Sequence, residues 1–258
     1  MLPLQFMAVF VFLFGAAIGS FLNVCIYRIP LEQSVVSPRS RCMSCGAEVR
    51  WYDNIPILSW FLLRGRCRSC GVSFSIRYPM IELLCACLTL LLFLRFGISV
   101  PFFVYFVLVA SLIVITFIDF DHQIIPDEIS LPGIGIGFIA SFFMPEPDWI
   151  SSGLGILAGW GGLAIIFYSY LWLTGREGMG GGDAKLLAML GAFLGLKAVP
   201  FIIFVSSLVG TVAGVTIMLL QRKGRHLAIP FGPYLAFGAV LYIFYGSWLI
   251  DWYLRLGK

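Results

Sequence analysis

Long apolar stretches alternate with short polar ones along almost the whole chain, and they set the predicted architecture. A lipid bilayer offers no partner for free backbone groups, so an apolar run of about 20 residues predicts a transmembrane helix. Only residues 28–77 form a long polar segment, and the run 184–196 is short for a full span. The eight predicted helices are 4–27, 78–96, 101–118, 129–144, 151–173, 184–196, 198–220 and 231–253.

The amino-acid composition supports a membrane protein. Of the 258 residues, 60% are hydrophobic and 12% are charged, whereas soluble domains carry about 25% charged residues. The first apolar run is too long for a cleaved signal peptide and has no basic segment before it, so it predicts a first transmembrane helix. We therefore expect an all-α polytopic membrane protein in contact with lipid. The net charge of +4 gives no reason to expect a nucleic-acid partner.

Lysine and arginine are distributed unevenly between the predicted loops. Thirteen of the 17 lie on the side that holds residues 28–77, and four lie on the other side. Positive charge marks the cytoplasmic side of a membrane protein. With eight helices, we expect both termini outside and residues 28–77, 119–128 and 174–183 in the cytoplasm. The predicted division is a first transmembrane helix (1–27), a cytoplasmic insertion (28–77) and a transmembrane core (78–258).

Four cysteines in the insertion form two Cys-x₂-Cys pairs. They are Cys42, Cys45, Cys67 and Cys70, and a glycine follows the second cysteine of each pair. This spacing is typical of a zinc ribbon, in which four thiolates bind one zinc ion tetrahedrally. Two disulfides are the alternative, which is disfavoured because the cytoplasm is reducing. With no open coordination position, the zinc is predicted to be structural and to fold an insertion too small to hold itself together.

A few polar or reactive residues lie within or next to the apolar runs. Cys25, Cys85 and Cys87 are expected to pack as small hydrophobic residues. Glu82 lies four residues into the second run, where a carboxylate that snorkels to the interface is slightly favoured over one that binds a ligand. His122 follows the third run and is expected to be an interfacial histidine rather than a proton relay.

A glycine-rich turn that ends in one carboxylate directly precedes the sixth apolar run. Its sequence is Gly180-Gly181-Gly182-Asp183. Glycines allow a second backbone, such as an extended peptide, to approach closely. A carboxylate at a membrane boundary is costly unless it is paired, protonated or functional, so Asp183 is a candidate site residue. The alternative is a glycine linker with Asp183 as the N-cap of the next helix.

Three aspartates, Asp119, Asp121 and Asp127, enter the same boundary after the third run. Asp119 directly follows the apolar residues and is expected to be the deepest, while Asp127 follows Pro126 and predicts a helix start. Two carboxylates in a low-dielectric site cannot easily both ionise, so they share a proton. In aspartic proteases the ionised carboxylate activates water and the protonated one polarises the peptide carbonyl. We predict that Asp119 and Asp183 form such a catalytic pair.

These motifs resemble those of the bacterial type IV prepilin peptidases (leader peptidase/N-methyltransferase), which are Gly-x-Gly-Asp intramembrane aspartyl proteases. The likeness runs in order from about residue 15 to residue 195. The matching segments are GSFLNVCIYRIP (19–30), the two cysteine pairs, RYPMIE (77–82), IDFDHQIIPD (118–127) and GGGDAKLLAMLGA (180–192).

The resemblance implies an activity and its cofactors. The family cleaves the basic leader from prepilins and pseudopilins at the cytoplasmic face of the bacterial inner membrane. It then methylates the new N-terminal amine with S-adenosylmethionine. The family's catalytic aspartates correspond to Asp119 and Asp183, and chains with all four cysteines are similar to its bifunctional members. No nucleotide motif marks the S-adenosylmethionine site, which we expect in the insertion and near residues 19–23.

Two other functions are considered. One is a different aspartyl intramembrane protease, presenilin-like or of the archaeal preflagellin type, which the zinc insertion disfavours. The other is a transporter or channel in which Asp119 and Asp183 carry ions. It is disfavoured because these carboxylates lie at the inner edge of the membrane and no internal repeat is visible.

Overall fold

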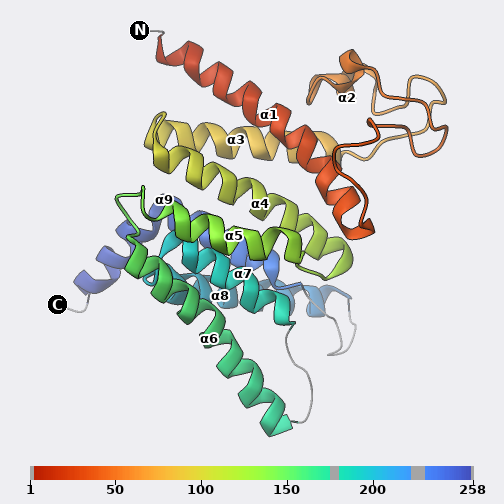
Figure 1. Ribbon diagram of the computed structural model, residues 1–258. Coiled ribbons are helices and arrows are strands. Elements are labelled where there is room, and N and C mark those ends of the chain that lie inside the picture. Colours follow the sequence, from red (N-terminus) through yellow and green to blue (C-terminus); the bar gives the residue numbers. More distant parts are fainter. Residues whose placement is uncertain (1–2, 175–179, 222–229, 257–258) are drawn as a thin grey trace. The chain divides into compact units, whose positions relative to one another are not determined.

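The computed structural model describes residues 3–174, 180–221 and 230–256 of the chain. Within these residues all regular structure is helical, apart from two isolated β-bridges (Figure 1). Each of the eight long helices overlaps one predicted apolar run, which confirms the all-α fold. The elements are α1 (Leu4–Arg28), the 3₁₀-helices η1 (Ile29–Leu31) and η2 (Trp51–Asn54), α2 (Leu58–Leu62), α3 (Arg77–Phe96), α4 (Val100–His122), α5 (Asp127–Ala140), α6 (Trp149–Thr174), α7 (Gly181–Leu194), α8 (Ala198–Gln221) and α9 (Gly232–Leu256).

Several helices have the length and composition of membrane spans. Among the described residues, four helices are long and apolar enough to cross a membrane, namely α1 extended by η1, α3, α4 and most of α8. Shorter apolar helices cover Trp149–Ile165 and Gly232–Gly246. The protein is therefore a multi-pass membrane protein. Because α5 and α7 have only 14 residues each, less than the roughly 20 of a full span, the eight crossings stay a prediction.

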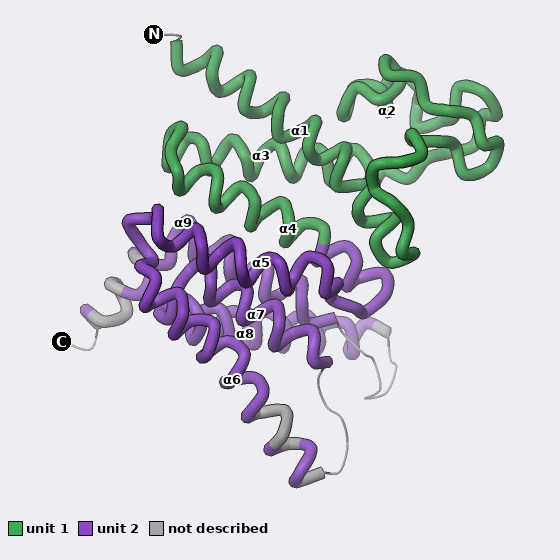
Figure 2. The backbone as a smooth tube through the Cα atoms, in the orientation of Figure 1, with its two compact units in different colours: residues 1–114 green, residues 115–258 purple. Residues whose placement is uncertain are grey.

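The chain forms two compact units, residues 1–114 and residues 115–258, which meet within α4 (Figure 2). In the first unit α1 packs along α3. A Cβ on Gly15 of α1 would lie 2.8 Å from the Cβ of Thr89, so only glycine allows this close approach. The two units are defined by which residues pack together. The predicted division of the chain after residues 27 and 77 concerns function and stays a prediction.

Three cysteines lie in the helices of the first unit. Cys25 of α1 and Cys85 of α3 are buried, as expected for small hydrophobic residues. Cys87 of α3 is exposed on the protein surface, on a helix that is long and apolar enough to cross a membrane, where a small hydrophobic residue can face lipid.

In the second unit α7 is the central helix. It contacts α5, α6, α8 and α9 (Figure 1), and every residue from Leu186 to Leu194 is buried. A helix that is apolar on all sides suits such a core position. The packing against α6 is close, since a Cβ on Gly191 would lie 2.1 Å from the carbonyl oxygen of Gly155. The short sixth apolar run is therefore a core helix that carries Asp183 in its first turn.

Candidate functional site

Asp119 lies in the last turn of α4 and is buried, with 4% of its surface exposed. Its Oδ2 accepts a hydrogen bond of 2.9 Å from the backbone N–H of Gly232, the first residue of α9. Asp121, two residues further on, is exposed. The predicted order of depth is confirmed. The contact of Gly232 with Asp119 was not predicted, although a glycine between Pro230 and Pro233 was a signal for a sharp turn into a helix.

Asp183 is the third residue of α7 and has 9% of its surface exposed. The N-cap of α7 is Gly180, so the alternative in which Asp183 caps the helix is wrong. The carboxylates of Asp119 and Asp183, both in the second unit, lie close enough for their charges to interact. The end of α4 and the starts of α7 and α9 therefore surround two buried carboxylates. Residues 175–179 of the predicted loop 174–183 lie outside the described residues.

A salt bridge joins the starts of α5 and α7 beside this pair. Lys185 Nζ lies 2.8 Å from both carboxylate oxygens of Asp127. Asp127 is the first residue of α5, which confirms the predicted helix start. Its pairing with Lys185 was missed, because the two residues are 58 positions apart. His122, at the end of α4, is exposed.

The four cysteines of the insertion lie on two similar turns. The N–H of Gly46 donates to the carbonyl oxygen of Cys42, and the N–H of Gly71 donates to that of Cys67, both at 2.9 Å. The φ angles of the two glycines are 70° and 75°, a region that glycine adopts without strain. This backbone geometry explains why a glycine follows each cysteine pair.

The two turns bring the four sulfur atoms together, all within 4.8 Å of one another. Cys42 Sγ lies 3.8 Å from Cys70 Sγ, and Cys45 Sγ lies 4.0 Å from Cys67 Sγ. Four sulfurs at about 2.3 Å from one zinc ion lie about 3.8 Å apart, whereas a disulfide is about 2.05 Å long. The backbone N–H groups of Cys45 and Ser44 lower the pKa of Cys42 to about 6. The cluster therefore has the spacing that a tetrahedral metal site requires.

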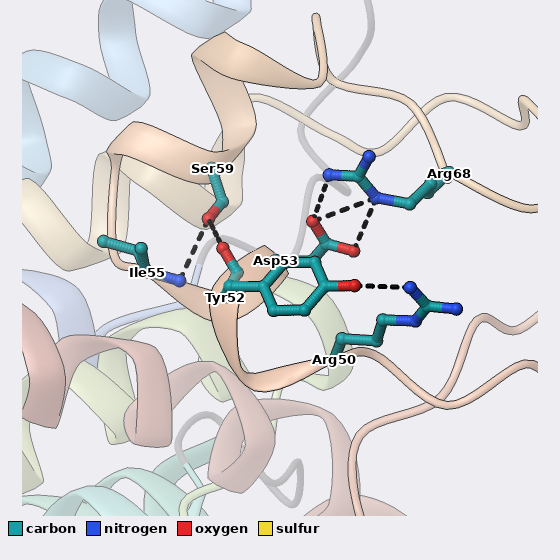
Figure 3. Close-up of polar contacts among 6 residues, drawn as sticks. All are labelled: Arg50, Tyr52, Asp53, Ile55, Ser59 and Arg68. Carbon is teal, nitrogen blue, oxygen red and sulfur yellow. Dashed lines mark hydrogen bonds and ion pairs between the residues drawn. The ribbon is translucent and has the colours of Figure 1, made fainter.

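A polar network connects the second cysteine turn to the rest of the insertion (Figure 3). The Arg68 guanidinium donates to both carboxylate oxygens of Asp53 at 2.6 to 3.1 Å. These hydrogen bonds hold the pKa of Asp53 below its usual value. Arg50 donates to the Tyr52 hydroxyl, and the Ser59 hydroxyl donates to the Tyr52 carbonyl oxygen. The network fixes η2 and α2 relative to the cysteine cluster.

A cavity of about 660 Å³ lies wholly within the first unit, between the insertion, the end of α1 and the start of α3. This volume is within the range of ligand pockets, roughly 300 to 1,000 Å³. The aromatic side chains of Tyr27, Trp60 and Tyr78 line it, together with Asn23 and Glu82. The cavity combines these rings with many polar and charged side chains, including five arginines (Arg28, Arg41, Arg50, Arg66 and Arg68).

Glu82 lies in the second turn of α3 and is buried, with 8% of its surface exposed. Its Oε2 accepts a hydrogen bond of 2.6 Å from the backbone N–H of Ile57 in the insertion. The favoured interpretation of a carboxylate that snorkels to the interface was therefore wrong. The insertion folds back over the start of α3, a contact between residues 25 positions apart that the local sequence does not reveal.

Comparisons with known proteins match both units. Residues 13–96 match the family described as Bacterial Peptidase A24 N-terminal domain, and residues 106–215 match the Type IV leader peptidase family. Three similar proteins are each named Prepilin leader peptidase/N-methyltransferase. The one from Pseudomonas putida is 36% identical, over 90% of this chain and 88% of its own length. Those from Aeromonas salmonicida (strain A449) and Neisseria gonorrhoeae are 36% and 42% identical, over 95% and 85% of this chain and 92% and 84% of their own lengths.

No solved structure matches the chain. The family matches nevertheless include every segment on which the likeness to prepilin peptidases was based. Both aspartates lie in the region 106–215, and all four cysteines lie in the region 13–96. The chain belongs to the type IV leader peptidase family, with the bacterial A24 N-terminal domain preceding the peptidase region.

Proposed function

We propose that this protein is a prepilin leader peptidase that also methylates the N-terminus it creates. Membership of the family and the names of its relatives support both activities and favour them over transport. The observation that carries the peptidase activity is the convergence of Asp119 and Asp183. Both are buried, they come from helices far apart in the chain, and their charges interact.

The two aspartates act as a pair on a water molecule and the scissile peptide. They share one proton, because like charges at short range in a low-dielectric site cannot easily both ionise. The ionised carboxylate takes a proton from water, and the resulting hydroxide attacks the peptide carbonyl carbon. The protonated carboxylate donates to the carbonyl oxygen and stabilises the negative charge that develops there. A proton then passes to the leaving amine as the C–N bond breaks.

The charge distribution supports an orientation for this reaction. Lysine and arginine concentrate on the predicted side of the insertion, which supports an orientation with the insertion and the aspartate pair at the cytoplasmic face of the bacterial inner membrane. The apolar N-terminal helix of a prepilin or pseudopilin then stays in lipid. Its basic leader remains in the cytoplasm, so the bond between the two lies at the level of the aspartates.

The insertion supplies the zinc site in this proposal. Cys42, Cys45, Cys67 and Cys70 hold one zinc ion, for which their sulfur spacing of 3.8 to 4.0 Å is suitable. Four thiolates leave no position for water or substrate, so the ion is structural. Residues 28–77 then form a metal-folded insertion, and the aspartate pair lies in the transmembrane core.

The second activity follows leader removal. S-adenosylmethionine supplies the methyl group when it is bound, and the new N-terminal amine is the acceptor. The cavity of the first unit fits such a donor, because it has the volume of a ligand site and carries both aromatic rings and a buried carboxylate. The protein's part is to bind the donor and orient it, since the sulfonium group is itself the reactive electrophile.

Co-expression with a prepilin tests both activities at once. Wild-type protein is expected to remove the leader and to add the mass of one methyl group to the mature N-terminus, as read by mass spectrometry. Loss of the leader without methylation would restrict the activity to the peptidase. An intact prepilin in the presence of correctly inserted protein would contradict the proposal.

Gly232→Ala is expected to lower leader cleavage by about 10- to 100-fold. A Cβ at this position would lie 2.6 Å from Asp119 Oδ2, so the carboxylate must move. A displacement of about 1 Å in a catalytic group costs on the order of 10²-fold in rate. Gly135→Ala is the matched control, because a Cβ there meets nothing within 4 Å. Cleavage kinetics of a purified prepilin compare the two variants, and equal rates would exclude Gly232 as a positioning residue.

A further inference from the structure

The wall of the cavity of the first unit includes one buried carboxylate, that of Glu82. Glu82 is more than nine-tenths buried and accepts a hydrogen bond from the Ile57 N–H. Among the described residues, no lysine or arginine forms an ion pair with it. A buried carboxylate is costly without a counter-charge. The cavity wall at Glu82 is therefore suited to a ligand that carries a positive charge.

The backbone that reaches Glu82 is strained. Ile57 has a φ of 64°, in the left-handed region that β-branched residues avoid. The backbone nitrogen of Ile57 lies 2.6 Å from Glu82 Oε2. The strained turn therefore holds the Glu82 carboxylate in place through this hydrogen bond. Strained backbone persists only where the surrounding structure holds it, and it is concentrated at ligand sites. The turn supports a binding role for Glu82 over a purely structural one.

The other walls carry aromatic rings together with cationic side chains, those of Arg28, Arg41, Arg50, Arg66 and Arg68. Tyr27, Trp60 and Tyr78 present aromatic rings to the cavity, and such rings stack on purine bases and attract cations. Asn23 is buried and uses its amide N–H groups on the carbonyl oxygens of Gly19 and Tyr78, at 3.3 and 3.2 Å. No described residue donates to its side-chain carbonyl oxygen, which is free to accept from a ribose hydroxyl or an amino group.

We infer that this cavity binds the methyl donor, a sulfonium nucleoside, with the Glu82 carboxylate facing its positive charge. The inference rests on the proposed methyltransferase function and assigns the site of that activity to the first unit. Glu82 supplies electrostatic attraction, the aromatic rings cover the base, and Asn23 accepts a hydrogen bond. Glu82 and Asn23 thus act as binding residues, and neither takes part in leader cleavage.

Direct binding of S-adenosylmethionine to the purified full-length protein in detergent tests this site. Calorimetry without any prepilin is expected to show binding to wild type and an affinity at least about tenfold weaker for Glu82→Gln, since the variant loses the charge–charge attraction to the sulfonium, and about 1.4 kcal/mol corresponds to tenfold in affinity. Glutamine keeps the volume and can still accept from the Ile57 N–H, so the variant is expected to fold. Glu82→Asp, which keeps the charge, is expected to bind better than Glu82→Gln.

Glu32→Gln is the matched control, because Glu32 is exposed in the insertion and does not line the cavity. It is expected to bind the donor as wild type does. The zinc content and the circular dichroism spectrum of Glu82→Gln are expected to match those of wild type, which reports that the protein is folded. Unchanged donor affinity in folded Glu82→Gln overturns the inference.

Crosslinking gives a second measurement that does not depend on any variant. Ultraviolet irradiation with labelled S-adenosylmethionine is expected to modify peptides between residues 20 and 82. Label confined to residues 115–258 overturns the assignment to the first unit. If wild type binds no donor at all, the methyltransferase function itself fails, and this result is distinct from a donor that binds equally to wild type and Glu82→Gln.

Discussion

Asparagine at Asp119 or at Asp183 is expected to lower leader cleavage by about 10³-fold or more, the largest loss of any single substitution in the second unit. Asparagine has nearly the same volume as aspartate and can still accept from the Gly232 N–H, so the packing around α4, α7 and α9 is retained. It cannot take a proton from water or hold one for the peptide carbonyl. General acid–base groups contribute about 10²- to 10⁴-fold. Single-turnover cleavage of a purified prepilin measures the loss.

Asp121→Asn is the control for this experiment. Asp121 is exposed and lies two residues beyond Asp119, so the substitution changes the same local charge without entering the buried pair. Its cleavage rate is expected to stay within about threefold of wild type, because exposed charges interact weakly. Because the members of a catalytic pair act as a unit, the double variant is expected to be no slower than either single variant. Rapid cleavage by folded Asp119→Asn would place the second carboxylate elsewhere.

Much of the architecture could be predicted because a backbone inside lipid can satisfy its hydrogen bonds in only a few ways. In a membrane only helices satisfy the backbone of a single apolar segment, so runs of apolar residues locate the helices to within a few positions. The depth of Asp119 followed from its place directly after such a run. The cysteine turns were also predictable, because ligand spacing and the following glycine are local features of the sequence. In each case the residues of one short segment were sufficient for the prediction.

The features that were missed are contacts between distant segments. Gly232 meets Asp119 across 113 positions, and the strained Ile57 turn covers Glu82, which local hydropathy suggested would reach water. The run that became α7 was described from the sequence only as short for a full span, because its length alone does not reveal four surrounding helices. Each miss depends on which elements pack together, and apolar runs in a membrane protein leave that open, since lipid and protein neighbours are equally apolar.

Cys42→Ser is expected to abolish metal binding and to unfold the insertion. The binding free energy of a structural zinc ion, about 10 to 16 kcal/mol, is also folding free energy. The insertion has little other core, since many of its large apolar side chains, such as those of Trp51 and Leu62, are exposed. Metal analysis is expected to fall from one zinc ion per chain to well below half. Limited trypsin digestion is expected to cut at the arginines of the insertion much faster than in wild type.

Cys87→Ser is the matched control, because this cysteine is exposed on α3 and outside the cluster. It is expected to keep the zinc ion and the protease resistance of wild type. Cys42 and Cys67 also line the cavity of the first unit, so Cys42→Ser is expected to lose S-adenosylmethionine binding along with the metal. Glu82→Gln, in contrast, should lose donor binding while it keeps zinc. A Cys42→Ser protein that keeps both its zinc and its resistance to trypsin would show that another set of ligands folds the insertion.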